Sequence, residues 1–241
     1  MFWDNIPSGY YDKIVKSGLC KNRGLQSYWH HITFMKLKKY IKKDYKILDF
    51  ACGPGTFFSY LDNKHSTGYD ISSKQILYAK DNYGSAKNIF TSDLEDLKIN
   101  NGYDLVTVNG LIEYLDENEF YNLLNNLKNL IKNKGEILIT TPNYKIPMII
   151  IEKLSHLFNL NDYSEVQKSL YTKKKFIKIL QNQKQSFEVI EIKHFLNIFS
   201  FISFFNIKLA YKFDYMFEKI TKNNFGFLLL VRIRVNNLNE N

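Results

Sequence analysis

Cysteine, proline and tryptophan are scarce in this chain of 241 residues, which contains two, four and two of them, respectively. The two cysteines, Cys20 and Cys52, exclude a disulfide framework and a cysteine-rich metal cluster. No Pro/Gly/Ser-rich segment and no internal repeat divides the chain. We therefore expect one domain, residues 1–241, in a reducing compartment.

Long hydrophobic runs are also missing. The longest apolar stretch, residues 195–207, is interrupted by Asn and Ser and falls short of the ~20 residues that cross a bilayer. Residues 1–13 lack a basic region followed by a long apolar segment, so they do not resemble a secretory signal. The expected location is cytoplasmic, with peripheral attachment to the inner face of the membrane as the alternative.

Positive charge is in excess, with 33 Lys and Arg against 24 Asp and Glu, which gives a net charge of +9. A basic surface favours nucleic acid or an anionic membrane as a partner. However, the chain is also rich in Lys, Asn, Ile, Tyr and Phe, a bias that an AT-rich genome produces by itself. Clusters such as KLKK (36–39) lie on amphipathic helices with solvated faces. The charge alone therefore does not identify a partner.

Predicted strands and helices alternate through the first two thirds of the chain, which indicates βαβ units and a parallel sheet. Strands are predicted at Lys46–Phe50, Ser66–Asp70, Asn88–Thr91, Tyr103–Asn109 and Glu136–Thr140. Helices are predicted at Gln26–Lys43, Gly55–Leu61, Ser72–Asn82 and from Asp116 onward, with Ser72 as an N-cap and Asp116 and Glu119 as a capping box.

The last third of the chain follows a different pattern. Helices are predicted at Lys145–Leu160 and Thr172–Gln181, and strands at Phe187–Lys193 and Phe225–Val235. The two strands could pair in antiparallel fashion, but an aromatic insertion at about 195–222 separates them. That connection is far too long for a tight turn.

The most informative segment is KILDFACGPGTF, residues 46–57, in which a strand ending near Asp49 leads into small residues and two glycines. In an open α/β sheet, ligands bind beyond the carboxyl ends of the strands. A dinucleotide fingerprint would need glycine at Ala51, Gly53 and Thr56, and two of the three are missing. The lysine-bearing phosphate loop is absent as well, so both phosphate-binding interpretations are weakened.

Several motifs in order resemble the class I S-adenosylmethionine-dependent methyltransferases, over roughly residues 20–235. LDFACGPGTF is similar to the first motif of the family. GYDIS places Asp70 where the acid of the family binds both ribose hydroxyls. SDLEDL places Asp93 where an acid accepts from the adenine amino group, with Leu94 offering its backbone N–H to the ring. NGLIEYL and KGEILITTPN are similar to the segments of the fourth and fifth strands.

The resemblance implies an α/β, Rossmann-like fold. It consists of a seven-stranded, mostly parallel sheet with an antiparallel last strand, helices on both faces, an N-terminal helical lid and the aromatic insertion between the last two strands. Within the domain, residues 1–43 are expected to form the lid, 44–143 the cofactor-binding core and 144–241 the substrate side. The implied cofactor is S-adenosyl-L-methionine, with S-adenosyl-L-homocysteine as product. The implied cofactor-binding residues are Asp49, Ala51, Gly53, Gly55, Asp70, Ile71, Asp93, Leu94 and Asn109.

The fourth-strand segment also bears on metal and acceptor. Family members that use a metal carry an E-x-x-E-H-like set there, and the corresponding residues are Gly110, Glu113 and Tyr114, so no metal is expected. The (N/D)PPY-like segment of adenine methylation is replaced by NGLI, so nucleic acid bases are not favoured, although ribose or rRNA methylation stays open. The chain is most similar to the small-molecule branch, which includes ubiquinone-biosynthesis and polysaccharide or glycolipid-pathway enzymes.

Candidate catalytic and substrate residues lie in the lid and after the fourth strand. His30 and His31 point about 100° apart on a helix, so only one could be a base, and a packing role is the alternative. Tyr28, Glu113 and Tyr114 are candidate wall residues, and Tyr114 could equally be a core aromatic. His156 and His194 could instead meet the substrate.

The aromatic insertion permits two interpretations. It could form a cap packed on the end of the sheet, or an interfacial element whose basic flanks meet anionic headgroups and admit a lipid-linked substrate. In the second case, membrane contact is expected through 195–212, together with IPMIII (146–151).

The function expected from the sequence is methyl transfer to a small-molecule acceptor, at oxygen, on a saccharide, lipid-linked or quinone-like compound. Two alternatives stay open, namely a non-catalytic cofactor-binding partner subunit and an RNA methyltransferase that uses the basic surface. The oligomeric state is open.

Overall fold

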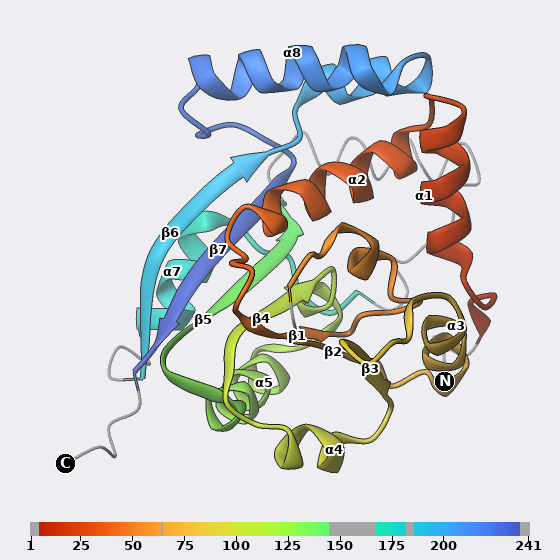
Figure 1. Ribbon diagram of the computed structural model, residues 1–241. Coiled ribbons are helices and arrows are strands. Elements are labelled where there is room, and N and C mark those ends of the chain that lie inside the picture. Colours follow the sequence, from red (N-terminus) through yellow and green to blue (C-terminus); the bar gives the residue numbers. More distant parts are fainter. Residues whose placement is uncertain (1–4, 64, 145–166, 182–185, 237–241) are drawn as a thin grey trace.

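The computed structural model describes residues 5–63, 65–144, 167–181 and 186–236 (Figure 1). The predictions for 145–160, 146–151 and His156 lie outside these residues. The α-helices are α1 (Tyr10–Cys20), α2 (Leu25–Lys38), α3 (Ser73–Tyr83), α4 (Leu94–Ile99), α5 (Glu117–Leu130), α7 (Lys173–Gln181) and α8 (Ile207–Ile220). Short 3-10 helices are η2 (Thr56–Tyr60), η3 (Ile112–Tyr114) and η4 (Ile198–Phe204).

Seven strands form one sheet in the order β3-β2-β1-β4-β5-β7-β6. They are β1 (Lys46–Phe50), β2 (His65–Tyr69), β3 (Asn88–Thr91), β4 (Tyr103–Asn109), β5 (Ile131–Pro142), β6 (Phe187–Phe195) and β7 (Leu228–Val235). Strands β1 to β5 are paired in parallel, whereas β7 runs antiparallel to both of its neighbours. The predicted Rossmann-like sheet with an antiparallel last strand is therefore confirmed.

Helices cover both faces of the sheet (Figure 1). On one face, α4, α5 and α7 bury a large apolar cluster against the central strands, including Leu97, Phe120 and Phe176. On the other face, Ile32 and Leu37 of α2 pack with residues of β1, β4 and β5. The N-terminal helix α2 is thus a layer of the core, because its apolar side is buried between the sheet and the C-terminal insertion.

Two of the predicted helices need correction. The helix predicted at Gly55–Leu61 is the 3-10 turn η2, in which the neighbouring rings of Phe57 and Phe58 are buried in two different clusters. The helix predicted to reach Lys43 ends at Lys38, because the next residues form tighter bonds such as Tyr40 N–H to the Leu37 carbonyl.

Of the two predicted helix caps, one forms its side-chain hydrogen bonds and the other does not. Asp116 and Glu119 form the expected reciprocal capping box at the start of α5. Ser72 stands at the N-cap of α3, but its side chain makes no capping hydrogen bond. The carboxylate of Asp70, just beyond β2, instead accepts from the Ser72 backbone N–H.

The insertion between β6 and β7 consists of η4 and α8. It leaves the sheet after Phe195 and returns at Leu228. Leu228 pairs with Phe195 on one side and with Pro142, at the end of β5, on the other. Because β5 runs parallel to β1 and β4, the insertion emerges from the edge of the sheet at which those strands end. In Figure 1, α8 lies across this end of the molecule, with α2 beneath it.

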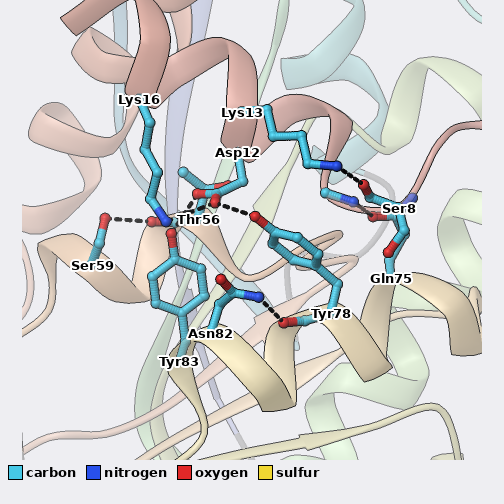
Figure 2. A network of polar contacts seen from close by, with 11 residues as sticks. Ser8, Asp12, Lys13, Lys16, Thr56, Ser59, Gln75, Tyr78, Asn82 and Tyr83 are labelled. Atoms are coloured by element: carbon cyan, nitrogen blue, oxygen red, sulfur yellow. Dashed lines mark hydrogen bonds and ion pairs between the residues drawn. The ribbon is translucent and has the colours of Figure 1, made fainter. Parts of the chain in front are cut away.

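A buried carboxylate attaches α1 to α3 (Figure 2). Asp12 has no exposed surface and accepts hydrogen bonds from the hydroxyl groups of Tyr78 (2.8 Å) and Tyr83, while Lys16 lies 2.9 Å away. Burial alone would raise the pKa of Asp12, but the hydrogen bonds from Tyr83, Lys16 and Tyr78 outweigh it, so the pKa is lowered. The backbone N–H of Gly9 adds a bond to the side chain of Gln75 (3.1 Å).

Candidate active site

The loop after β1 follows an alternating backbone path. Ala51, Gly53 and Gly55 all have positive φ angles, of 64°, 53° and 74°. A left-handed conformation costs an L-residue roughly 1–2 kcal/mol and glycine almost nothing. At Gly55 a side chain would also collide, because a Cβ atom would lie 3.0 Å from both Ala79 and Phe90. At Gly53 a Cβ atom would meet nothing within 4 Å, so this glycine faces open space.

Asp70, just beyond β2, is bound to this loop. One carboxylate oxygen accepts from the Gly53 N–H at 2.8 Å, and the other accepts from the Ser72 N–H at 2.9 Å. Burial raises the pKa of Asp70, and the two backbone hydrogen bonds oppose that shift. The two bonds position the carboxylate before any ligand binds. Each oxygen keeps a further lone pair for a ligand.

Asp49 lies on β1 directly opposite Thr107 of β4. It is 3% exposed and accepts a hydrogen bond from the Thr107 hydroxyl at 2.6 Å. Burial raises the pKa of Asp49 to about 7, the negative charge of Asp70 adds to the shift, and the Thr107 bond opposes it. A positively charged ligand group nearby would favour the ionised form of both acids.

Asp93 lies between the end of β3 and the start of α4. Its side chain caps α4 by accepting from the Glu95 N–H at 2.9 Å, and its own N–H donates to the Thr91 hydroxyl at 3.0 Å. Asp93 therefore serves as a helix cap through one oxygen, and its other oxygen takes no part in the cap. Ile71 and Leu94, the neighbours of Asp70 and Asp93, are exposed apolar residues.

The segment after β4 carries a second buried acid. Glu113, in η3, accepts from the Thr141 hydroxyl at 3.2 Å, and its carbonyl accepts from the Lys168 and Ser169 N–H groups. Burial raises the pKa of Glu113 to about 7, with smaller opposing effects from a backbone hydrogen bond and from Thr141. Asn109 ends β4 and accepts a hydrogen bond from the Thr140 hydroxyl.

Tyr28 and His30, the first two candidates of the expected lid, lie on α2. Tyr28 has no exposed surface, and its hydroxyl donates to Asp214 of α8 at 2.6 Å, so it joins α2 to α8. His30 contacts the rings of Tyr11 and Phe34, and burial lowers its pKa to about 4.

The remaining candidates are His31, Tyr114 and His194. The His31 Nδ1 lies 2.8 Å from the Tyr60 hydroxyl, and burial lowers the pKa of His31. Tyr114 is half-buried in η3, next to Glu113. His194, at the end of β6, is buried and lies 3.2 Å from the carbonyl of Asn223.

The structure therefore brings the ends of β1, β2, β3 and β4 to one edge, with the candidate cofactor residues on them. Sequence reasoning missed Thr107, Thr140 and Thr141, which orient Asp49, Asn109 and Glu113. Register alone could have found Thr107, because it stands opposite Asp49 in a parallel pair. Within the described ranges, no group of three or more His, Cys, Asp or Glu residues is arranged to hold a metal ion.

The part of the chain that matches a known protein family contains these residues. Residues 47–135 match a family described as a methyltransferase domain. That segment begins in β1 and includes Asp49, the glycine loop, Asp70, Asp93 and Glu113. No curated protein sequence matches the chain.

Solved structures are similar over most of the chain. The plantazolicin methyltransferase BpumL in complex with SAH is 19% identical, with a TM-score of 0.60, over 98% of this chain and 93% of that one. Magnesium protoporphyrin IX methyltransferase from Synechocystis PCC 6803, with bound SAH, is 13% identical (TM-score 0.56; 97% and 90% covered). A SAM-dependent methyltransferase from Archaeoglobus fulgidus is 19% identical (TM-score 0.57; 86% and 94% covered). At these identities the likeness concerns the fold.

Proposed function

We propose that this chain is a class I S-adenosylmethionine-dependent methyltransferase, which binds that cofactor at the β1–β4 edge and transfers its methyl group to a small-molecule acceptor. The methyltransferase-domain match of residues 47–135 and the fold support this proposal. The single observation that carries the proposal is the joint placement of Asp49, Gly53 and Asp70. Asp49 is a buried acid on β1, Gly53 is an open glycine in the loop after β1, and Asp70, just beyond β2, is a carboxylate oriented by that loop.

These residues suit a cofactor without phosphates. Gly53 leaves room for the amino acid tail to approach the backbone, since no atom lies near its absent side chain. Asp70 presents free lone pairs to two adjacent ribose hydroxyls, with charge-assisted bonding. Asp49, whose pKa is raised by burial to about 7, gains from a cationic neighbour. When bound, the cofactor supplies an activated methyl group on a cationic sulfur.

We assign the acceptor atom to oxygen, with Glu113 as the candidate base. Its carboxyl group is buried, follows β4 at the same edge and is held by Thr141. A pKa of about 7 leaves a large ionised fraction at neutral pH, as a general base requires. His30 and His31 remain second candidates for this role. In the transfer, the acceptor oxygen forms a bond to the methyl carbon, the carbon–sulfur bond breaks toward sulfur, and the hydroxyl proton passes to the base.

The proposed acceptor class is a saccharide, lipid-linked or quinone-like compound. Its support is the similarity of the fourth-strand segment to the small-molecule branch, where NGLI stands instead of an adenine-methylating motif. Water exclusion and positioning then account for much of the rate, since displacement at a methyl group depends on the alignment of nucleophile and leaving sulfur.

Calorimetry with S-adenosyl-L-homocysteine tests the cofactor assignment. Wild type should bind, and Asp70→Ala should not. Asp81→Ala, which changes an exposed acid on the same helix that follows Asp70, is the matched control and should bind like wild type. Failure of the wild type to bind would remove the proposal. Incubation with methyl-labelled cofactor and a cell extract then tests transfer, and a labelled small molecule is the expected product.

A further inference from the structure

Helix α8 is amphipathic, but its apolar stripe faces away from the protein. The residues of α8 that are buried include two acids, Asp214 and Glu218. Four apolar residues at spacings of four, three and four lie on the opposite side and are exposed. We call them the outer stripe, and they are Leu209, Phe213, Met216 and Ile220. An ordinary surface helix has the reverse arrangement, with its apolar stripe against the core.

The acids on the inner side are used to attach the helix. Asp214 accepts from the hydroxyl of Tyr28 at 2.6 Å and from the Asn197 N–H at 3.3 Å. Glu218 forms an ion pair with Lys36 of α2. These contacts join α8 to α2 through polar groups, and the outer stripe takes no part in them. The inverted orientation is therefore specified by bonds within the protein.

Lysines accompany the outer stripe on one side. Lys208, Lys212 and Lys219 lie about 60–100° from Leu209 around the helix axis, all in the same direction, and we call them the basic flank. All three are exposed. Both acids of α8 are buried on the inner side, so the outer surface of this helix carries positive charge only.

Exposed apolar residues also occur in and directly after η4, which contacts the outer stripe where the ring of Phe199 stacks on Phe213. Phe205, directly after η4, is 85% exposed, and Phe204 and Ile198 are also exposed. Beside the end of α8, a cavity of about 170 Å³ is lined by Lys36, Lys39, Lys193 and Lys219, among other residues that include Glu218. Lys219 belongs both to this cavity and to the basic flank, so further lysines adjoin the flank.

We propose that the outer stripe and the basic flank dock this protein on an anionic lipid bilayer. An apolar stripe beside a row of lysines without acids fits the boundary between acyl chains and anionic headgroups. Isolated exposed apolar residues are ordinary, but a regular stripe on a helix held by its acids is not. No helix among the described residues is long and apolar enough to cross a membrane, so the contact is peripheral.

Docking through α8 would present the functional edge of the sheet to the bilayer. The insertion leaves and re-enters the sheet at the edge where β1, β4 and β5 end. Among the acceptors considered, this favours a lipid-linked one, and this consequence rests on the proposed function. The docking itself does not, because it needs neither cofactor nor acceptor.

Flotation of the full-length protein with vesicles tests the docking. Vesicles of phosphatidylcholine mixed with phosphatidylglycerol should carry wild type upward, whereas pure phosphatidylcholine should carry much less. Ile220→Glu should weaken binding about ten-fold or more, because it places a charge in the outer stripe. Lys212→Glu should weaken it about five-fold or more and reduce its salt dependence.

The matched controls are exposed residues of α3 and α4, outside α8 and η4. Ile99→Glu changes an isoleucine on α4 that is 80% exposed, compared with 77% for Ile220. Lys80→Glu changes an exposed lysine on α3. Both controls should float like wild type. Circular dichroism and S-adenosyl-L-homocysteine binding should be unchanged in all four variants, because each substituted side chain lies on the surface.

Three results would overturn the docking: no flotation of wild type, equal flotation on both vesicle types, and equal losses in α8 and control variants. A wild type that is dimeric in sedimentation, and made monomeric by Ile220→Glu without any vesicle binding, would assign the surface to a second copy instead. Loss of cofactor binding with intact flotation would reject the proposed function and leave the docking standing.

Discussion

The Gly53 N–H donates a hydrogen bond to the carboxylate of Asp70, 17 residues further along the chain. The bond joins the loop after β1 to the residue after β2. It therefore connects the two segments that should bind the amino acid tail and the ribose of the cofactor. Because the second oxygen of Asp70 accepts from Ser72, the carboxylate is held from both sides. A ligand that binds here meets groups already in position.

Replacing Asp70 by Asn should separate cofactor binding from stability. The amide keeps one oxygen acceptor but loses the charge, and charge-assisted hydrogen bonds contribute about 1.5–3 kcal/mol. We expect affinity for S-adenosyl-L-homocysteine to fall roughly ten- to hundred-fold by calorimetry, with a smaller change in thermal stability. Asp81→Asn is the control. An Asp70→Asn protein with wild-type affinity would contradict the ribose assignment.

The two loop glycines should respond differently to alanine. Both have positive φ, so each substitution strains the backbone by about 1–2 kcal/mol. At Gly55 the new methyl group would also press on Ala79 and Phe90, so Gly55→Ala should be the less stable protein in thermal unfolding. At Gly53 the methyl group would enter open space, so Gly53→Ala should chiefly lose cofactor affinity. Equal losses of stability would show that Gly53 is also packed.

Because of the buried carboxyl group of Glu113, the free energy of unfolding should fall as the pH rises. Its pKa is raised by burial from 4.5 to about 7 in the folded state, so the folded protein holds the proton more tightly than the unfolded chain. The free energy of unfolding then decreases as pH rises from about 4.5 to 7, by roughly 3 kcal/mol for this group.

Glu113→Gln removes the titrating proton and should remove this part of the pH dependence. Urea unfolding at pH 5 and pH 8 measures it, since the stability of the Gln variant relative to wild type should be higher at pH 8. Glu117→Gln, at an exposed acid on α5, is the control. Parallel stability profiles for wild type and Glu113→Gln would show that this carboxyl group is not perturbed.

Removing one hydroxyl around Asp12 should loosen the N-terminal helix. Tyr83→Phe deletes one of the hydrogen bonds that hold a fully buried carboxylate, at an expected cost of about 1–3 kcal/mol. Hydrogen exchange of the α1 amides should accelerate, while that of β1 and β4 should change less. Tyr45→Phe, for whose hydroxyl the described part of the chain supplies no hydrogen-bond partner, is the control. Unchanged exchange in α1 would mean that other contacts hold this helix.

Much of the fold could be predicted from the sequence because local pattern and local chemistry agree there. The buried run before Asp49, the glycines after it and the Asp116 capping box are recognisable within a few residues. Ends of elements were harder to predict, since the end of α2 at Lys38 depends on a tightening of its last turn. The sequence predicts an α-helix where η2 lies, because the burial of Phe57 and Phe58 in two different clusters depends on tertiary contacts.

The sequence by itself determined the order of strands and helices, the glycine-rich loop and the spacing of the acids Asp49, Asp70 and Asp93, because strand and turn preferences act over short distances. Only the tertiary structure decided which residues orient those acids, and that the Tyr28 hydroxyl binds Asp214 of α8. It also decided the orientation of α8. Helical periodicity shows that a helix has two unlike sides, but long-range polar bonds select the side that is buried.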